Sequence, residues 1–316
     1  MDAQTSTKRI LIFLAFAFGI PWGAALGFYL TGMLETNPRQ AMMLVNYIFI
    51  FIPALANIAA RLITREGWKK LWLRPNFKRG WKFYLAAWLL PLGAAIPGSL
   101  IYYLLFPQAF DPSAARAIRQ ISIFTSAAAA GPGMAMMALI VEQMFLQGLL
   151  ISVVAIGEEF GWRAYLFQKL IDRFGSARNA AVLVGLIWGI WHLPMIFMGL
   201  ETGRTTLPWG LIYPISTTSS SILLSWATLR GGSVWPAAIG HTTELGVGGI
   251  SMGLLKGNMN MLVSPNPQSM IGNLGFIALA LALYFNRKAF ARTAFTGPKE
   301  MRSEQEPAVA GAQQGA

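Results

Sequence analysis

The sequence contains no cysteine, which excludes disulfides, thiolate metal ligands and a cysteine nucleophile. Histidine is almost as rare, with two among 316 residues, and there are only 13 acidic residues. Charged residues make up 12% of the chain, whereas hydrophobic residues make up 55%. Any polar site must therefore be assembled from a small number of side chains.

Long runs of apolar residues occupy most of the chain. Their length matches the ~20 residues with which a helix crosses a ~30 Å hydrocarbon core. The short alternating segments of a membrane barrel are absent. The sequence therefore predicts an all-α polytopic membrane protein, a bundle of about eight transmembrane helices. The predicted spans are residues 10–33, 41–60, 83–106, one long span within 134–166, 181–200, 209–229, 234–254 and 270–286.

The positions of the basic residues decide between a membrane and a nucleic acid as partner. The net charge is +12, and alternating spans would place most of the lysines and arginines on one side. That side holds Lys8 and Arg9, the 61–82 loop, the 163–178 segment, Arg230 and the C-terminal tail. By the positive-inside rule this side is cytoplasmic, and so are both termini. The basic excess then reflects topology and attraction to the lipid bilayer, and no nucleic acid is needed.

The chain is predicted to form one integral membrane domain over residues 1–295, in the cytoplasmic membrane if the protein is bacterial. Its first apolar run is longer than the core of a signal peptide and is interpreted as an uncleaved span. The 65–88 loop interleaves tryptophans with lysines and arginines, which is typical of an interfacial hairpin, with a substrate-docking platform as the alternative. Residues 296–316 are predicted to be a disordered cytoplasmic tail.

Ionisable side chains inside the predicted spans are few. Placing each one in the membrane costs ~2.5–3.5 kcal/mol on insertion scales, so each is expected to have a partner or a function. If the fourth helix runs from about Ile140 to Leu166, Glu158 lies ~12 Å inside the cytoplasmic boundary, at about the depth of His192 and His241. Three helices then bring polar groups to one level of the membrane, which is the geometry of a site. Glu142 lies ~24 Å of helix away from Glu158 and is excluded.

The pair of glutamates at 158 and 159 is expected to divide into two roles. Glu159 and Arg163 have the i,i+4 spacing of a self-neutralising pair. Glu158 is rotated away from that pair, and a carboxylate among apolar helices suits a general base that acts on water. The structural alternative is a charged helix end that pairs with itself, together with two buried imidazoles that donate to backbone carbonyls.

The fifth span has features that would shape a pocket around His192. Gly185 and Gly189 form a GxxxG face that permits close approach of a neighbouring helix. Pro194 removes the backbone hydrogen bond to the carbonyl of Ile190 and predicts a local kink beside His192. Trp188 precedes His192 by one turn and would line the pocket or pack against substrate.

Three motifs in this order carry a resemblance to a known family. The segment EEFGWR, at 158–163, fits EExxxR, and WGIWH, at 188–192, is a variant of FxxxH. His241 corresponds to a third motif that usually reads HxxxN. These motifs resemble the CPBP family, which includes the type II CAAX-processing intramembrane endopeptidases and their Abi-like, bacteriocin-processing relatives. The resemblance is specific over about 140–250, within a protease-like core of about 134–254.

The resemblance implies a catalytic role for five residues. Glu158 and His192 would activate a water that attacks a peptide bond, and His241 would polarise the carbonyl oxygen or bind a metal. Glu159 and Arg163 would support this constellation.

Two positions depart from the family pattern. Trp188 stands where a phenylalanine is usual, and Leu245 stands where an asparagine would donate to the oxyanion. Glu244, one residue earlier, lies on roughly the same face. It could take part only as a protonated donor or as a metal ligand.

Zinc is a candidate cofactor, because His192, His241 and Glu158 would provide a His₂Glu set with an open position for water. A metal-free pair of glutamate and histidine is an equal alternative. The predicted function is a metalloprotease-like intramembrane endopeptidase that cuts a membrane-associated protein or peptide. A non-catalytic immunity or scaffold protein that keeps the site as a polar structural cluster is the alternative, and a proton-coupled transporter is a more distant one.

Overall fold

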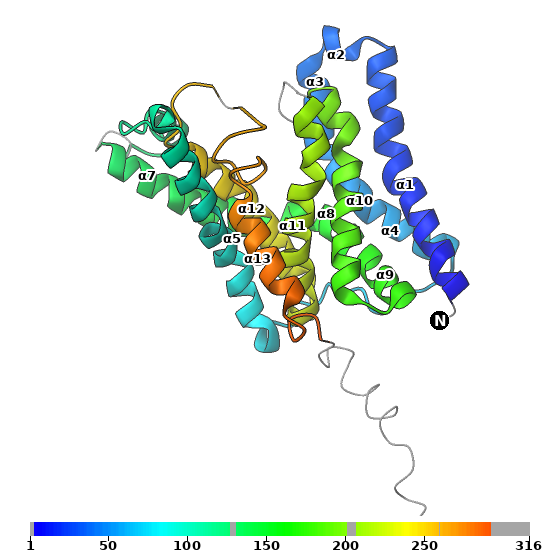
Figure 1. Cartoon of the computed structure of the whole chain (residues 1–316). Coiled ribbons are helices and arrows are strands. Elements are labelled where there is room, and N and C mark those ends of the chain that lie inside the picture. The colour runs from blue at the N-terminus through cyan, green and yellow to red at the C-terminus, as the bar shows by residue number, and fades with distance from the viewer. Residues whose placement is uncertain (1–2, 127–130, 201–206, 259, 292–316) are drawn as a thin grey trace, which may run out of the picture.

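The computed structural model describes residues 3–126, 131–200, 207–258 and 260–291. No strand occurs among these residues, and helices follow one another along the chain, so the all-α prediction is confirmed. The helices are α1 (Ala3–Leu30), α2 (Met33–Thr36), α3 (Pro38–Ile48), α4 (Ile52–Ile63), α5 (Phe77–Leu105), α6 (Ala115–Ile121), α7 (Pro132–Val141), α8 (Ser152–Gly161), α9 (Phe167–Phe174), α10 (Ala177–Phe197), α11 (Leu207–Gly231), α12 (Trp235–Met252) and α13 (Leu274–Phe285) (Figure 1). A 3₁₀ turn, η1 (Phe49–Phe51), joins α3 to α4.

Within the described residues, five helical segments are long and apolar enough to cross a membrane. They are Thr5–Leu30, Pro38–Ile63, Phe77–Leu105, Pro132–Leu150 and Ala177–Phe197. The predicted count of eight is therefore not confirmed. Helix α13 is apolar but only 12 residues long, and α11 and α12 carry buried hydroxyl, imidazole and carboxylate groups. The protein is therefore an all-α membrane protein. Many of its buried polar side chains belong to α11 and α12.

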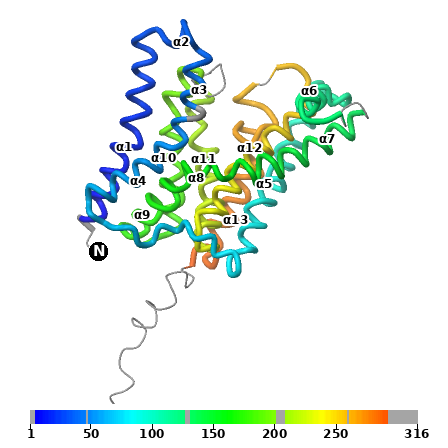
Figure 2. Tube along the Cα trace, turned by 180° about the vertical axis from the view of Figure 1, so that it is seen from behind, coloured from blue at the N-terminus to red at the C-terminus, as the bar shows by residue number. Residues whose placement is uncertain are grey.

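The two adjacent glutamates lie in the middle of a long helical path. This path runs from α7 through the π-helix η4 (Glu142–Leu150), α8 and the π-helix η5 (Trp162–Leu166) to α9. Figures 1 and 2 show it crossing the molecule from α7, beside α6, to α9, near the N-terminus. Glu158 and Glu159 are buried, with 7% and 0% relative exposure. The prediction that this helix continues past the glutamates is confirmed.

Helices α10 and α11 pack at backbone distance. A methyl group added to Gly185 would lie 2.5 Å from the Cα atom of Thr218, and one added to Gly189 would lie 2.5 Å from the Cα atom of Pro214. The predicted GxxxG contact is thus present, and α11 is the neighbour that uses it.

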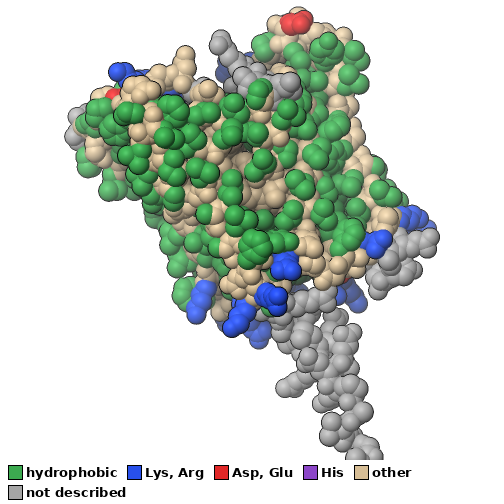
Figure 3. Space-filling model, in the orientation of Figure 1, with side chains coloured by type: hydrophobic (Ala, Val, Ile, Leu, Met, Phe, Trp, Pro, Cys, Tyr) green, Lys and Arg blue, Asp and Glu red, His purple; other side chains and the backbone are tan. Residues whose placement is uncertain are grey.

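Basic side chains gather at one end of the molecule, where α1 begins and α13 ends (Figure 3). Hydrophobic side chains cover the surface between the two ends in this view. This distribution agrees with the predicted cytoplasmic side. The predicted disordered tail, 296–316, lies outside the described residues.

The predicted interfacial hairpin at 65–88 is shorter than expected, because α5 begins at Phe77. Trp68 and Trp81 are exposed, as that interpretation requires, with 51% and 46% relative exposure. Trp72 instead packs against the hydrophobic core, and its carbonyl accepts a hydrogen bond from Val234. The loop is therefore partly a structural connection between α4, α5 and α12.

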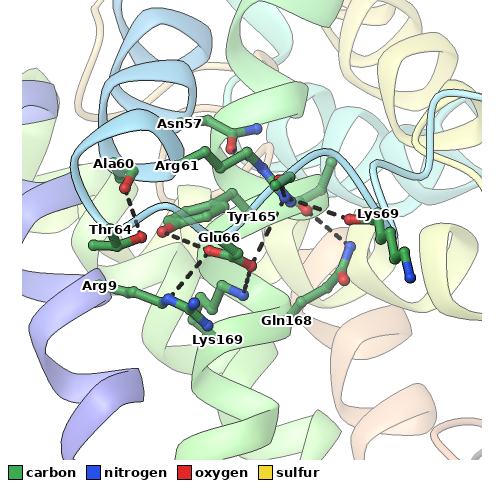
Figure 4. Close-up of polar contacts among 12 residues, drawn as sticks. Arg9, Asn57, Ala60, Arg61, Thr64, Glu66, Lys69, Tyr165, Gln168 and Lys169 are labelled. Atoms are coloured by element: carbon green, nitrogen blue, oxygen red, sulfur yellow. Dashed lines mark hydrogen bonds and ion pairs between the residues drawn. The ribbon is translucent and has the colours of Figure 1, made fainter. Parts of the chain in front are cut away.

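A cluster of charges around Glu66 ties three helices together at the basic end (Figure 4). The Glu66 carboxylate forms ion pairs with Arg9 of α1, Arg61 of α4 and Lys169 of α9, and Tyr165 donates a hydrogen bond to it at 3.4 Å. The four charged side chains have between 2% and 13% relative exposure. Burial lowers the pKa of Lys169, and the Glu66 carboxylate acts in the opposite direction. We call these residues the Glu66 cluster.

Candidate active site

Glycines on α8 explain how two carboxylates come to be buried side by side. A methyl group at Gly157 would lie 2.7 Å from the backbone oxygen of Ile50, and one at Gly161 would lie 2.5 Å from the carbonyl carbon of Pro53. The backbone of α8 therefore sits directly against η1 and α4 on that side. Both flanking positions need glycine because any side chain would collide with a neighbouring backbone. Glu158 and Glu159 are held in the protein interior by this contact.

Glu159 joins the site helix to α12. Its Oε1 atom accepts hydrogen bonds from Arg163 Nη1 and from His241 Nδ1, both at 2.8 Å. The predicted Glu159–Arg163 pair is present, and both side chains are fully buried. An ionised carboxylate only accepts hydrogen bonds, so His241 carries a proton on Nδ1. Glu159 thereby fixes the orientation of the His241 ring and directs Nε2 away from itself.

Glu158 bonds to different partners. Its Oε2 atom accepts a hydrogen bond from the indole nitrogen of Trp188 at 2.8 Å and a longer one from that of Trp162 at 3.3 Å. Within the described part of the chain, no hydrogen bond reaches its Oε1 atom, which is also not among the fully buried polar atoms. The carboxylate is therefore anchored through one oxygen and presents the other.

Trp188 lies between the two histidines. Its carbonyl oxygen is 2.9 Å from His192 Nδ1, so His192 donates from Nδ1 and has its lone pair on Nε2. The Trp188 ring lies edge-on to His192 and to His241, with centroid distances of 5.8 and 5.2 Å. The guanidinium carbon of Arg163 lies over the same ring, 4.5 Å from its centroid. Trp188 therefore contacts Glu158, Arg163 and both histidines.

These groups line one cavity of about 210 Å³. Glu158, His192 and His241 all contribute to its wall, whereas Glu159 and Arg163 are buried behind them. The structure thus brings together three polar positions from three helices, as their matched depth predicts. Glu142 does not line the cavity, and its carboxylate bonds to Gln143.

Further polar side chains, which the sequence motifs do not include, also line the cavity. Helix α11 contributes Tyr213, Ser216, Thr217 and Ser220, and the segment before α13 contributes Gln268. The signal for α11 is present in the sequence, because residues 216–221 are six consecutive serines and threonines inside a predicted span. No local signal marks Gln268, which reaches the cavity because the loop before α13 folds into the helix bundle.

Glu244 and Leu245 also line the cavity. Glu244 is buried, and its Oε1 atom accepts a hydrogen bond from Ser220 at 2.5 Å. Leu245 is 45% exposed and places an apolar side chain next to it. A carboxyl group therefore occupies the α12 wall, one residue before the position at which the family motif has an amide.

The residues present do not assemble a ready-made zinc site. Among the described residues, no three histidine, aspartate or glutamate side chains form a group that could hold a metal ion. The hydrogen bonds of His241 Nδ1 and Glu158 Oε2 leave His241 Nε2 and Glu158 Oε1 as the atoms that would face a metal.

Comparison with known proteins places this site in a recognisable context. Residues 133–244 match the family model of the type II CAAX prenyl endopeptidases, Rce1-like. The chain is 29% identical over 150 residues to CAAX prenyl protease 2 of Methanococcus maripaludis, an alignment that covers 45% of this chain and 51% of the relative. The chain thus spans about half the length of the curated relative it matches. The resemblance carried by the three motifs is confirmed, and the matched region contains Glu158, Glu159, Arg163, His192 and His241.

Proposed function

We propose that the protein is an intramembrane endopeptidase that hydrolyses a peptide bond of a membrane-associated protein or peptide. One observation carries the proposal: a carboxylate and two imidazoles from three helices line a single buried cavity. The match to a protease family over this same region supports it. Glu158, Glu159, Arg163, His192 and His241 are the residues we assign to the reaction.

Glu158 and His192 are suited to activate the attacking water. Glu158 Oε1 and His192 Nε2 are both acceptors, and a water molecule has two hydrogens to donate. The water oxygen attacks the carbonyl carbon as Glu158 takes one proton, and the C–N bond then breaks as that proton passes to the leaving nitrogen. Glu158 returns to its ionised form, so the cycle is balanced in protons. The two indole hydrogen bonds keep the carboxylate in place throughout.

His241 is suited to stabilise the negative charge that develops on the carbonyl oxygen. Its Nδ1 proton is bonded to Glu159, and the Glu159 carboxylate favours a second proton on the ring. The resulting Nε2–H group can donate to the oxyanion. Arg163 neutralises the remaining charge of Glu159 and holds it in position.

The proposed substrates are chain segments that reach the membrane, including a prenylated C-terminus of the CAAX type. The name of the methanogen relative, a CAAX prenyl protease, supports this class. The cavity also offers apolar contacts, because Val45, Ile50 and Leu245 line it beside the polar groups.

Zinc stays a prediction. If zinc is bound, His192, His241 and Glu158 are the residues we expect to hold it, and the metal would polarise the substrate carbonyl. Metal analysis of protein purified without chelators tests this directly. Zinc at one equivalent that is lost on His192→Ala substitution would support the site, and metal-free active protein would exclude it.

The alternative is a non-catalytic membrane protein. It is favoured by one observation, that the polar groups of the site are already bonded to one another through Glu159 and Trp188. Such a network could hold the helices together without reacting.

The proposed hydrolysis is tested with purified protein in lipid nanodiscs and two matched peptides that end in a CAAX sequence, one with its cysteine farnesylated and the three following residues still attached, and one without the lipid. Products are analysed by mass spectrometry in ¹⁸O-labelled water. We expect one ¹⁸O atom in the new carboxyl group, and cleavage of only the lipidated peptide would assign the CAAX class. Cleavage of both peptides would indicate a broader specificity. No cleavage by folded protein of either peptide, or of co-expressed membrane proteins, would favour the non-catalytic alternative.

A further inference from the structure

The buried site contains more carboxylates than cations. Glu158, Glu159 and Glu244 surround it, and Arg163 is the one arginine or lysine that contacts them among the described residues. Arg163 and His241 are both bonded to Glu159. The one guanidinium of the site is therefore already paired, and Glu244 has no counterion within this group.

Glu244 is the carboxylate that lacks a charged partner. Its hydrogen-bond donor is the neutral hydroxyl of Ser220, and it forms no ion pair within the described part of the chain. An ionised carboxylate buried without a cation is costly, because hydration is lost and nothing replaces it. A proton on Glu244 removes that cost.

The position and hydrogen bond of Glu244 indicate which of its two oxygen atoms carries this proton. Glu244 follows His241 by three residues on α12, so both side chains lie on one face and line the same cavity. Its Oε1 atom accepts from Ser220, whose hydroxyl also bonds to the carbonyl of Ser216 on α11. Within the described residues no hydrogen bond reaches its Oε2 atom, and this atom is not among the fully buried polar atoms that lack a partner. The carboxyl group is therefore anchored at one oxygen and presents the other to the cavity.

We propose that Glu244 is a neutral carboxylic acid whose Oε2–H group donates a hydrogen bond to the carbonyl oxygen of the bound substrate. This inference rests on the proposed endopeptidase function. Two donors, His241 Nε2–H and Glu244 Oε2–H, then meet the oxyanion from one helix face. Leu245 cannot donate, so the acid of the preceding residue supplies the second donor, and Ser220 sets its orientation.

Other titratable groups near Glu244 come from four elements. Glu158, Glu159 and Arg163 belong to α8 and η5, His192 belongs to α10, and His241 shares α12. Helix α11 contributes hydroxyl groups to this cavity, and Gln268 contributes an amide. The two acidic residues on α8 oppose ionisation of Glu244, whereas Arg163 and a protonated His241 favour it. Loss of the Glu244 proton as pH rises removes the donor, so the proposal predicts an alkaline limb in the activity profile.

The test compares kcat and KM for Glu244→Ala, Glu244→Gln, Ser220→Ala and a control, Ser219→Ala, with the peptide that the wild type cleaves. The Ser219 hydroxyl bonds to Ser216 and Asn273 and does not line the cavity, so the control removes a buried hydroxyl from the same turn. We expect Glu244→Ala to lower kcat about 100-fold with little change in KM, because one oxyanion donor is lost. The amide of Glu244→Gln still donates, so this variant should retain most of kcat, and its alkaline limb should be changed to the one that the loss of the His241 proton alone produces. Ser220→Ala should lower kcat less than Glu244→Ala, and Ser219→Ala should leave it unchanged.

Two results would overturn the proposal. Equal loss in Glu244→Gln and Glu244→Ala would mean that an ionised carboxylate is required, and full activity in Glu244→Ala would mean that the side chain does not contact the oxyanion. Thermal unfolding of each variant identifies folding defects, and the near-isosteric Glu244→Gln variant keeps the pH test available if the alanine variant does not fold. Glu158→Gln, measured in parallel, separates this inference from the function itself. If Glu158→Gln is inactive while Glu244→Ala is fully active, the proposed role of Glu244 is rejected and the proposed endopeptidase function is not.

Discussion

Trp188 contacts Glu158, Arg163 and both histidines of the candidate site. Its indole nitrogen donates to Glu158, its carbonyl accepts from His192, and its ring contacts both histidines and Arg163. The sequence predicts a residue that lines the pocket, and Trp188 does line it. The indole of Trp188 donates a hydrogen bond to Glu158, which a phenylalanine at this position could not do.

Replacing Trp188 with Phe separates these contributions. The ring contacts remain, but the hydrogen bond to Glu158 is lost, and hydrogen bonds to charged groups contribute ~1.5–3 kcal/mol. We expect kcat for peptide cleavage to fall about tenfold, with a small change in the unfolding temperature.

Trp235→Phe is the matched control for that variant. The indole of Trp235 donates to the carbonyl of Leu73, away from the cavity, so the same kind of bond is removed elsewhere. Equal kcat in the two variants would show that the indole of Trp188 has only a packing role.

Of the two hydrogen bonds that Glu159 accepts, the sequence predicts one and not the other. Its pair with Arg163 follows from local spacing, because residues four apart on a helix are neighbours. Its bond to His241 joins positions 82 residues apart. Depth along each helix predicts that the two side chains share a level of the membrane, but rotation about the helix axes decides which glutamate meets which histidine. That rotation depends on packing between α8 and α12, which no local pattern encodes.

At the scale of elements, the contact between α10 and α11 positions His192 against the polar wall of the cavity. The GxxxG spacing of Gly185 and Gly189 predicts a close neighbour without identifying it. Helix α11 is that neighbour, and the threonine hydroxyl of Thr217 bonds to the carbonyl of Gly185 across the contact. The hydroxyl-rich face of α11 thus serves both packing and the cavity.

Gly185→Ala is expected to destabilise the protein. The new methyl group would lie 2.5 Å from the Thr218 Cα atom, and overpacking of this kind costs ~1–3 kcal/mol. The measurement is the unfolding temperature in detergent. Gly93→Ala in α5 is the control, because a methyl group there meets nothing within 4 Å. A Gly185→Ala variant as stable as the control would contradict the close α10–α11 contact.

The Glu66 cluster joins α1, α4 and α9 at the basic end of the protein. Glu66→Gln would leave Arg9, Arg61 and Lys169 close together without their shared carboxylate. We expect a loss of about 3–5 kcal/mol in the free energy of unfolding, as for a buried ion pair that loses one partner. Adding Lys169→Met should recover part of the loss, because it removes one of the repelling charges.

The double variant also tests the physical cause. If Glu66→Gln with Lys169→Met is less stable than Glu66→Gln alone, packing rather than charge is the main contribution of Lys169. Chemical denaturation of the three proteins under one set of conditions provides the comparison.

At the scale of the whole molecule, the distribution of charge predicts how the protein sits in the membrane. The absence of native cysteine makes this directly measurable, because a single introduced cysteine has no background. Lys78 in the first turn of α5 and Gln108, three residues after α5 ends, are both exposed. In intact cells, Gln108→Cys should react with an impermeant maleimide, whereas Lys78→Cys should react only after the membrane is permeabilised. The reverse pattern would invert the predicted topology.

The sequence predicts the architecture better than the number of spans. Apolar composition can be recognised within each helix separately. The all-α membrane class and the helical path through the two glutamates could therefore be predicted from it. Helices α11 and α12 differ, because they are lined with hydroxyl and ionisable groups on their protein-facing sides and so lose the hydropathy of a lipid-facing helix. The wall that they contribute, including Ser220 and Gln268, becomes evident only when the bundle is assembled.

The central claim is that Glu158 takes the proton of the attacking water. Its most direct test is kcat/KM for peptide cleavage by Glu158→Gln and by Glu142→Gln, which removes the same charge from a membrane glutamate outside the cavity. We predict that Glu158→Gln lowers kcat/KM by at least ~10²–10⁴-fold with the fold intact, and that Glu142→Gln stays close to wild type. Comparable kcat/KM values for Glu158→Gln and the wild type would contradict the assignment of Glu158 as the general base.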